Sequence, residues 1–350
     1  MELIILVVSF VVILAGAELF TNGIEWFGHK LGLAEGAVGS VLAAVGTALP
    51  ETMIPIIAIL FASGEHSEAV GVGAILGAPF MLATLAMFVT GLAVLAVSRR
   101  RAGGDTMLVD TAVLAHDMRY FAIAYGLAIA AAFLPLEPVA LKWIVAVCLV
   151  CIYGWYVKGH FETEAGDGGP ADLAPLRMHR LDVRGKREEP AVPRLRVVNV
   201  QVIAALGLIV LGAVAFVGAV EGIAETIGVD EVLLALVIAP IATELPEKFN
   251  SVLWVRAGKD TLAMGNITGA MVFQATIPTF VALVFAPLAW QIGAGSYTAF
   301  ASAGIAFLAS AAIFIPMARS GRLRGRNLLI GGVFYLLYLG LVVGVVTGIL

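Results

Sequence analysis

The sequence predicts an all-α polytopic membrane protein, with ten transmembrane helices arranged as two inverted five-helix repeats. Three observations carry that prediction. Hydrophobic residues make up 61% of the 350 positions and charged residues only 13%, against about 25% charged residues in soluble domains. Basic residues gather in alternate loops between the apolar runs. A short motif recurs in both halves of the chain.

Ten apolar runs are long enough to cross a bilayer, which takes about 20 helical residues. Between the fifth and sixth runs, residues 159–197 are polar and contain several glycines and prolines, which is typical of a linker. We therefore expect a first five-helix repeat at 1–158, a cytoplasmic linker at 159–197 and a second five-helix repeat at 198–350. The runs are residues 3–23, 34–62, 69–97, 113–134, 139–158, 198–220, 231–256, 260–288, 296–317 and 327–349.

The loop charges predict the orientation. With the N-terminus outside, only Lys142 of the 21 Lys and Arg residues lies in an outside loop, and Lys248 lies within a run. Because basic residues are enriched on the cytoplasmic side of membranes, we expect a multi-pass protein of the plasma (cell) membrane, with both termini outside and the 159–197 loop in the cytoplasm. Five spans per half then give the halves opposite senses, as an inverted repeat requires.

The repeated motif reads Gly-Thr-Ala-Leu-Pro-Glu at residues 46–51 and Ala-Thr-Glu-Leu-Pro-Glu at residues 242–247, each inside an apolar run. A carboxylate at bilayer depth is costly and is by default a functional residue. Each proline removes a helical hydrogen bond and so frees a backbone carbonyl. Carboxylates and carbonyls together form the oxygen-rich site that Ca²⁺ prefers. We therefore expect Glu51 and Glu247 to bind a metal cation.

The residues around the two glutamates could extend the site. Thr47 and Thr243 lie four residues before them and share their helix face, so they either add oxygens or bond to their own helix. Glu244 can share the face of Glu247, and a further carboxylate there would make the site sensitive to protons. Lys248 either neutralises one of the glutamates or points away and pairs with a neighbour.

The eighth apolar run adds polar groups that the third lacks. Asn266 and Gln274 are eight residues apart, so they lie on roughly one helix face, and each can present an amide oxygen. Gly265 and Gly269 allow another helix to approach closely. The positions in the first half that correspond to the two amides are apolar. We therefore expect the second half to supply more of the polar lining, including Asn266 and Gln274 as cation ligands.

These residues resemble a known family, the cation/Ca²⁺ exchanger superfamily, and its prokaryotic sodium/calcium exchanger branch in particular. The repeated motif is similar to the two family signatures Gly-Thr-Ser-Leu-Pro-Glu, and residues 265–271 match part of a second signature, Gly-Asn-x-x-Gly-Ser-Asn. The resemblance covers almost the whole chain. It implies alternating access and export of Ca²⁺ against entry of Na⁺ or H⁺, with the motif glutamates as central ligands. The signature serines are replaced by Ala48, Glu244, Ala78 and Ala270. One helical turn after the second serine the family has an amide or a carboxylate, and this position is Leu82 in the first half and Gln274 in the second.

Three functional hypotheses follow. The first is a secondary antiporter that exports Ca²⁺ in exchange for Na⁺ or H⁺ and binds its ions at the midplane between helices 2, 3, 7 and 8. The missing oxygens leave open an H⁺-coupled exchanger of another cation, such as Na⁺, K⁺ or Mg²⁺. The third helix lacks oxygen ligands that the family has, which leaves open a cation sensor that does not transport.

Other classes are disfavoured by what the loops contain. They show no nucleophile–base pair and no glycine loop for phosphate, so we expect no enzyme and no cofactor besides the transported cations. The expected partners are the lipid bilayer and inorganic cations, with no nucleic acid, and the oligomeric state is left open. The five histidines lie near span ends or in loops, where we expect them to be solvated: His29, His66, His116, His160 and His179.

Overall fold

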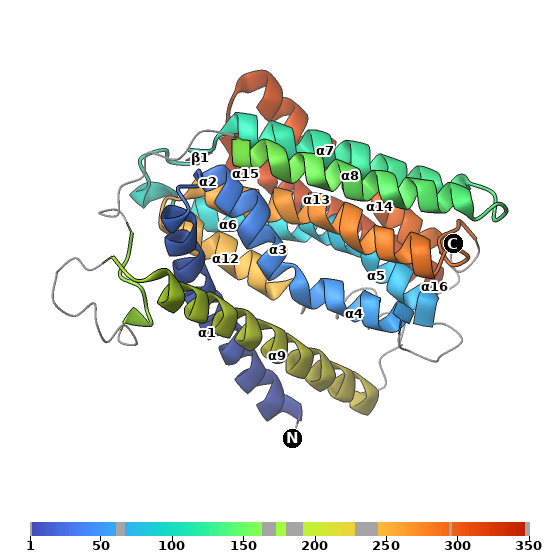
Figure 1. Cartoon of the computed structure of the whole chain (residues 1–350), viewed down its shortest axis with the longest axis horizontal. Helices are drawn as coiled ribbons and strands as arrows, with labels where there is room; N and C mark the ends of the chain where they lie inside the picture. The colour runs from blue at the N-terminus through green and yellow to red at the C-terminus, as the bar shows by residue number, and fades with distance from the viewer. Residues whose placement is uncertain are drawn as a thin grey trace.

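The computed structural model describes residues 2–60, 67–162, 173–179, 192–227, 244–293 and 296–346, and these are mostly helical (Figure 1). Within these ranges, seven helices are long and apolar enough to cross a membrane. They coincide with seven of the predicted spans, while the ten-span inverted repeat itself stays a prediction. The seven are Glu2–Lys30, Gly71–Arg100, Ala140–Glu162, Leu195–Phe216, Asp260–Phe285, Tyr297–Ser320 and Gly325–Val345.

The described part of the first half contains eight α-helices, and two of the predicted spans there are interrupted by π-helical turns, η1 and η2. Such turns are frequent at functional sites. The elements are α1 (Glu2–Lys30), α2 (Glu35–Ala37), η1 (Val38–Ala43), α3 (Ala44–Thr47), α4 (Leu49–Leu60), α5 (Ser67–Met81), η2 (Leu82–Ala86), α6 (Met87–Val97), the 3₁₀ turn η3 (Ser98–Arg100), β1 (Thr106–Met107), α7 (Thr111–Ala130), the 3₁₀ turn η4 (Ala131–Phe133) and α8 (Ala140–Glu162).

The second half contains the longest helix described, α9. The two short strands β1 and β2 pair antiparallel and join the loop before α7 to the turn after α14. Residues 228–243, which include Thr243 and the first part of the predicted span 231–256, lie outside the described residues. The elements are α9 (Leu195–Ile227), α12 (Leu245–Arg256), α13 (Asp260–Phe285), α14 (Tyr297–Ser320), β2 (Leu323–Arg324), α15 (Gly325–Leu328) and α16 (Ile330–Val346).

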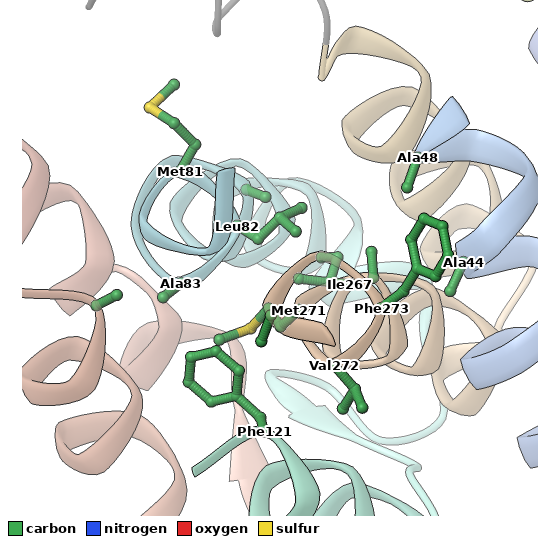
Figure 2. Close-up of a cluster of buried hydrophobic side chains, with 14 of the residues drawn as sticks. Ala44, Ala48, Met81, Leu82, Ala83, Phe121, Ile267, Met271, Val272 and Phe273 are labelled. Atoms are coloured by element: carbon green, nitrogen blue, oxygen red, sulfur yellow. The ribbon is translucent and has the colours of Figure 1, made fainter. Parts of the chain in front are cut away.

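Helix α13 forms the centre of the molecule. Most of its residues are buried, and it packs against α7, α8, η1, α12 and α5. Helices α1 and α9 lie side by side along one edge, and α7 and α8 lie together at the opposite edge (Figure 1). Apolar side chains fill the space around α13, among them Leu82 from η2, Ala44 from α3 and Phe121 from α7 (Figure 2). Polar groups on α13 are therefore surrounded by closely packed apolar side chains.

Lys142, the exception to the predicted charge pattern, is fully buried near the start of α8. Its Nζ donates to the carbonyls of Pro287 and Trp290, at 2.6 and 2.9 Å, in the connection after α13. The Trp290 indole in turn donates to the Ala128 carbonyl at the end of α7. This basic side chain thus binds the start of α8 to the connection after α13. Its structural role explains why a lysine occurs in a loop that was predicted to lie outside, where other basic residues are not expected.

Candidate functional site

The first copy of the repeated motif interrupts its helix, and the described part of the second copy has the same backbone geometry. Ala48 separates α3 from α4 with φ −78° and ψ 2°, and Glu244 precedes α12 with φ −87° and ψ 9°. A new 12-residue helix then begins at Leu49 in the first copy and at Leu245 in the second. Because Pro50 carries no N–H group, the break in the first copy leaves a carbonyl without a helical donor. The two glutamates of the motif therefore lie in the first turn of equivalent helices.

The Glu51 and Glu247 carboxylates lie close enough to each other to interact directly, and we call them the facing pair. Their residues are 7% and 0% exposed. No N–H or O–H donor from the other described residues reaches either carboxylate. A buried carboxylate without a partner is strongly unfavourable, and two that face each other also repel. This arrangement therefore requires a positive charge, either a cation or protons, between the two groups.

Side chains of α13 contact the two helices that meet at the first copy of the motif, α3 and α4. Gln274 Nε2 lies 3.0 Å from Thr52 Oγ1 and 3.4 Å from the Ala48 carbonyl, which leaves Gln274 Oε1 buried without a partner among the described residues. Thr47 Oγ1 lies 3.1 Å from Asn266 Oδ1. It also lies 3.1 Å from the carbonyl of Ala43 in its own helix. The bond of Thr47 to its own helix, one of the two roles expected of it, is thus seen, and its role as a cation ligand stays a prediction.

The Asn266 amide has two chemically distinct orientations at this position. With Oδ1 toward Thr47, its Nδ2 has no partner among the described residues. With the amide turned over, Nδ2 donates to Thr47 Oγ1 and the threonine proton goes to its own helix. The atom left free is then an oxygen. A bound cation would favour this second orientation, since it supplies an oxygen ligand and satisfies the Thr47 hydroxyl.

Lys248 neutralises a glutamate, which decides between the two alternatives for its side chain. Its Nζ donates to Glu244 Oε2 at 2.9 Å, and both residues are buried. Glu244 Oε1 has no partner in the described part of the chain. Glu244 also lies close enough to act electrostatically on Glu51 and Glu247. Lys248 therefore pairs with the additional carboxylate and also acts electrostatically on Glu247, while no basic side chain in the described part of the chain forms an ion pair with Glu51 or Glu247.

The first half contributes less polar lining than the second. Ala48 and Leu82 are completely buried in the apolar core, and Figure 2 shows both beside α13. Ala270 is buried in the same cluster. Thr243, the remaining residue expected in the site, lies outside the described residues. The structure thus places Glu51, Glu247, Glu244, Thr47, Asn266 and Gln274 on or next to the neighbouring elements α3, α4, α12 and α13. Thr52, which was not expected in the site, lies there as well and contacts Gln274.

Two glycines of α13 allow its backbone to contact η1. A Cβ atom built at Gly269 would lie 2.0 Å from the Ser40 carbonyl oxygen, and one at Gly265 would lie 2.8 Å from Ser40 Oγ. Real side chains do not tolerate such distances, so only glycine fits at Gly269. The close approach expected from these glycines is therefore present, and its partner is the π-helical part of the second predicted span.

Substitution of Gly269 by alanine should destabilise the protein by about 1–3 kcal/mol or more, because the added methyl group meets backbone atoms that cannot rotate away. Thermal unfolding of the purified protein in detergent would measure the change. Gly154→Ala, on the exposed face of α8 with no described atom within 4 Å, is the control, and its Tm should stay at or slightly above the parent value. A Gly269→Ala protein with the parental Tm would show that α13 and η1 are not in contact.

A buried carboxylate that the sequence argument missed lies behind this contact. Asp117 of α7 is completely buried and accepts from side chains of three other elements. His160, which we expected to be solvated, is only 5% exposed and lies 2.8 Å from Asp117 Oδ1. That expectation was wrong because the last turn of α8 packs onto α7, so a position near a span end is covered by protein. The proximity of His116 to His160 is a further consequence of this packing.

The comparisons with known proteins agree with this geometry. Residues 1–159 and 198–347 match the family described as "Sodium/calcium exchanger protein". The chain belongs to this family. It is accordingly a transmembrane protein of an exchanger family, whose members are transporters and not enzymes.

Solved structures of the sodium-calcium exchanger NCX_Mj have the same fold. The structure soaked with 2.5 mM Na⁺ and 0.1 mM Sr²⁺ superposes with a TM-score of 0.72 at 15% identity, over 97% of this chain and 99% of that one. The structure soaked with 2.5 mM Na⁺ and 0.1 mM Ca²⁺ gives a TM-score of 0.70 at 14% identity, over 97% of each chain. Identity this low establishes similarity of fold alone.

A curated relative matches over a shorter stretch. It is the protein named "Putative antiporter CaxA" of Alkalimonas amylolytica, which is 27% identical over 142 residues. The match covers 41% of this chain and 43% of that protein. The chain therefore aligns with less than half the length of this relative.

Proposed function

We propose that the protein is a secondary cation antiporter that exports Ca²⁺ from the cytoplasm in exchange for Na⁺ or H⁺ by alternating access. The cation binds between α4, α5, α12 and α13, with Glu51 and Glu247 as its central ligands. The protein resides in the plasma membrane as two inverted five-helix repeats, with both termini outside and the 159–197 linker in the cytoplasm. The observation that carries the proposal is the buried pair of facing carboxylates.

The remaining oxygens of the site suit a hard divalent cation. Ca²⁺ takes six to eight oxygen ligands in a flexible arrangement. Among the described residues no three His, Cys, Asp or Glu side chains group as a metal site, so neutral oxygens have to complete the shell. Gln274 Oε1 and the Asn266 amide lie on α13 and the Thr47 hydroxyl lies on α3, and both elements pack against the helices α4 and α12 that carry the glutamates. Thr243 is expected to add a further hydroxyl by analogy with Thr47.

The same pair of carboxylates explains why transport would be an exchange. Without positive charge between them, Glu51 and Glu247 leave two uncompensated carboxylates in a low-dielectric interior, which is costly. The site therefore changes its side of access only when cations or protons neutralise it. Release of Ca²⁺ on one side must be followed by binding of Na⁺ or H⁺ before the site can return. This charge requirement alone is enough to couple the movement of Ca²⁺ to the opposite movement of Na⁺ or H⁺.

A second candidate is H⁺-coupled exchange of another cation, such as Na⁺, K⁺ or Mg²⁺. The apolar side chains of Ala48, Leu82 and Ala270 remove neutral oxygens that several Na⁺ ions would need. Protons need no such oxygens, because they bind the glutamates directly. The same loss of ligands motivates a third candidate, a cation sensor that binds without transport.

Flux measurements on proteoliposomes distinguish these functions. We expect ⁴⁵Ca²⁺ to accumulate when an outwardly directed Na⁺ or H⁺ gradient is imposed, with each gradient applied separately to identify the coupling ion. Protein-free liposomes and liposomes with Glu51→Gln protein are the controls. Absence of Ca²⁺, Na⁺, K⁺ and Mg²⁺ flux under both gradients would refute the antiporter. Thermal stabilisation by a cation in that case would support the sensor.

A further inference from the structure

Asp117 is the hub of a buried network that joins four elements. Its Oδ2 accepts from Ser40 Oγ of η1 at 2.8 Å and from Thr268 Oγ1 of α13. Its Oδ1 lies 3.1 Å from the Tyr156 hydroxyl and 2.8 Å from His160 Nε2, both on α8. All five side chains are buried. Both oxygens of this carboxylate therefore have two partners, in contrast to Glu51 and Glu247, which have none of this kind.

The network holds the π-helical turn from two sides. The Tyr156 hydroxyl lies 2.9 Å from the Ser40 carbonyl oxygen as well as from Asp117. Gly265 and Gly269 place the α13 backbone directly against Ser40. The side chain and the backbone of Ser40 are thus both fixed, and η1 cannot shift along α13 without breaking these contacts. Hydrogen bonds to a buried charged group are among the stronger ones in proteins.

The two segments that Asp117 connects, η1 and α13, both lead to residues of the proposed cation site. Ser40 lies seven residues before Thr47 on one continuous helical segment, which is about two turns. Thr268 lies two residues after Asn266 on α13. Thr47 and Asn266 are themselves in contact at 3.1 Å. Asp117 therefore bridges the same two segments as the Thr47–Asn266 contact, but at a distance from the glutamates.

We infer that Asp117 is a positioning residue for the cation site, acting through Ser40 and Thr268 to hold η1 and α13 in the register that brings Thr47 and Asn266 together. It does not touch the cation. The inference rests on the proposed function, because the effect it predicts is an effect on cation affinity. A network that only stabilises the fold would alter the amount of folded protein and leave the affinity unchanged.

The Thr268 hydroxyl provides the cleanest test. Thr268→Val keeps the shape of the side chain and removes the hydrogen bond to Asp117, whereas Thr268→Ser keeps the hydroxyl. Thr279→Val is the matched control, since Thr279 is also buried on α13 and its hydroxyl has no partner among the described residues. The measurement is the initial rate of ⁴⁵Ca²⁺ exchange in proteoliposomes against Ca²⁺ concentration. Ser40→Ala, which removes the other donor to Oδ2, is measured in parallel.

We expect Thr268→Val and Ser40→Ala to raise the KM for Ca²⁺ by about tenfold, as loss of a hydrogen bond to a charged group allows, with Vmax per folded protein unchanged. Thr268→Ser and Thr279→Val should keep the parental KM. A parental KM in both Thr268→Val and Ser40→Ala overturns the positioning role while the proposed function stands. A parent protein that exchanges no Ca²⁺ overturns the proposed function, and this inference with it.

Discussion

Glu51→Gln and Glu247→Gln should each abolish exchange while leaving a folded protein. Glutamine keeps the size of the side chain, but it removes one of the two charges that face each other in the site and introduces an N–H₂ group that repels a cation. Loss of a charged ligand in a buried site is worth about 3 kcal/mol, or roughly a hundredfold in affinity. We therefore expect the flux of ⁴⁵Ca²⁺ to fall by at least that factor in each variant.

The folded state should not suffer from these substitutions. Each one removes half of a repelling pair, so without added cation the Tm in detergent should equal or exceed the parental value. Added Ca²⁺ should raise the Tm of the parent but not that of the variants. Glu162→Gln, at the exposed end of α8, is the control and should behave as the parent in flux and in Tm. Parental flux in either site variant would show that the glutamate concerned is not a ligand.

The helix starts that carry Glu51 and Glu247 could be predicted from the sequence because local rules determine them. An apolar run of sufficient length implies a span, and a proline within the run implies a break at the residues before it. The break in the first copy lies where Pro50 suggests, and Glu244 in the second copy has backbone angles similar to those of Ala48. The amides of α13 followed from helical spacing in the same way. Features that depend on a single helix, such as where it begins and which residues share a face, could therefore be predicted from the residue pattern.

The Asp117 network could not be predicted, because it depends on the packing of several elements. Asp117 lies between His116 and Arg119 near the start of its span, a pattern typical of a solvated helix end. Its burial results from η1, α8 and α13 meeting on one side of α7, with contacts 77 and 151 residues apart in the sequence. No local signal marks such a contact. The signal that was available is the pair Gly265 and Gly269, which indicates a close neighbour without identifying it.

The partner of the Lys248 side chain could not be predicted from the sequence for a different reason. It lies next to Glu247 and four residues after Glu244, so neighbouring rotamers reach different partners. The structure selects Glu244, and the pair is almost completely buried. Removing one member of a buried ion pair typically costs about 3–5 kcal/mol, because the other charge is left uncompensated. The pair should therefore respond very differently to single and double substitutions.

Lys248→Thr and Glu244→Ala introduce the residues found at the matching positions of the first half, Thr52 and Ala48. We expect Lys248→Thr to destabilise the protein by about 3–5 kcal/mol, since Glu244 is then an unpaired buried carboxylate. Glu244→Ala should instead lower the apparent affinity for the transported cation, because the freed Lys248 ammonium then competes with the cation for the adjacent Glu247. Thermal unfolding in detergent and the KM for ⁴⁵Ca²⁺ exchange would measure the two effects.

The double variant Glu244→Ala/Lys248→Thr decides whether the pair acts as a unit. It removes both charges and gives α12 the side chains that already fold at the start of α4, so we expect it to recover most of the stability and affinity that the single variants lose. Such recovery is a coupling energy of several kcal/mol in a double-mutant cycle, well above the few tenths expected for independent sites. Additive losses would show instead that Lys248 does not serve Glu244. In that case its ammonium would belong with the facing carboxylates, and the site would carry a built-in counter-charge.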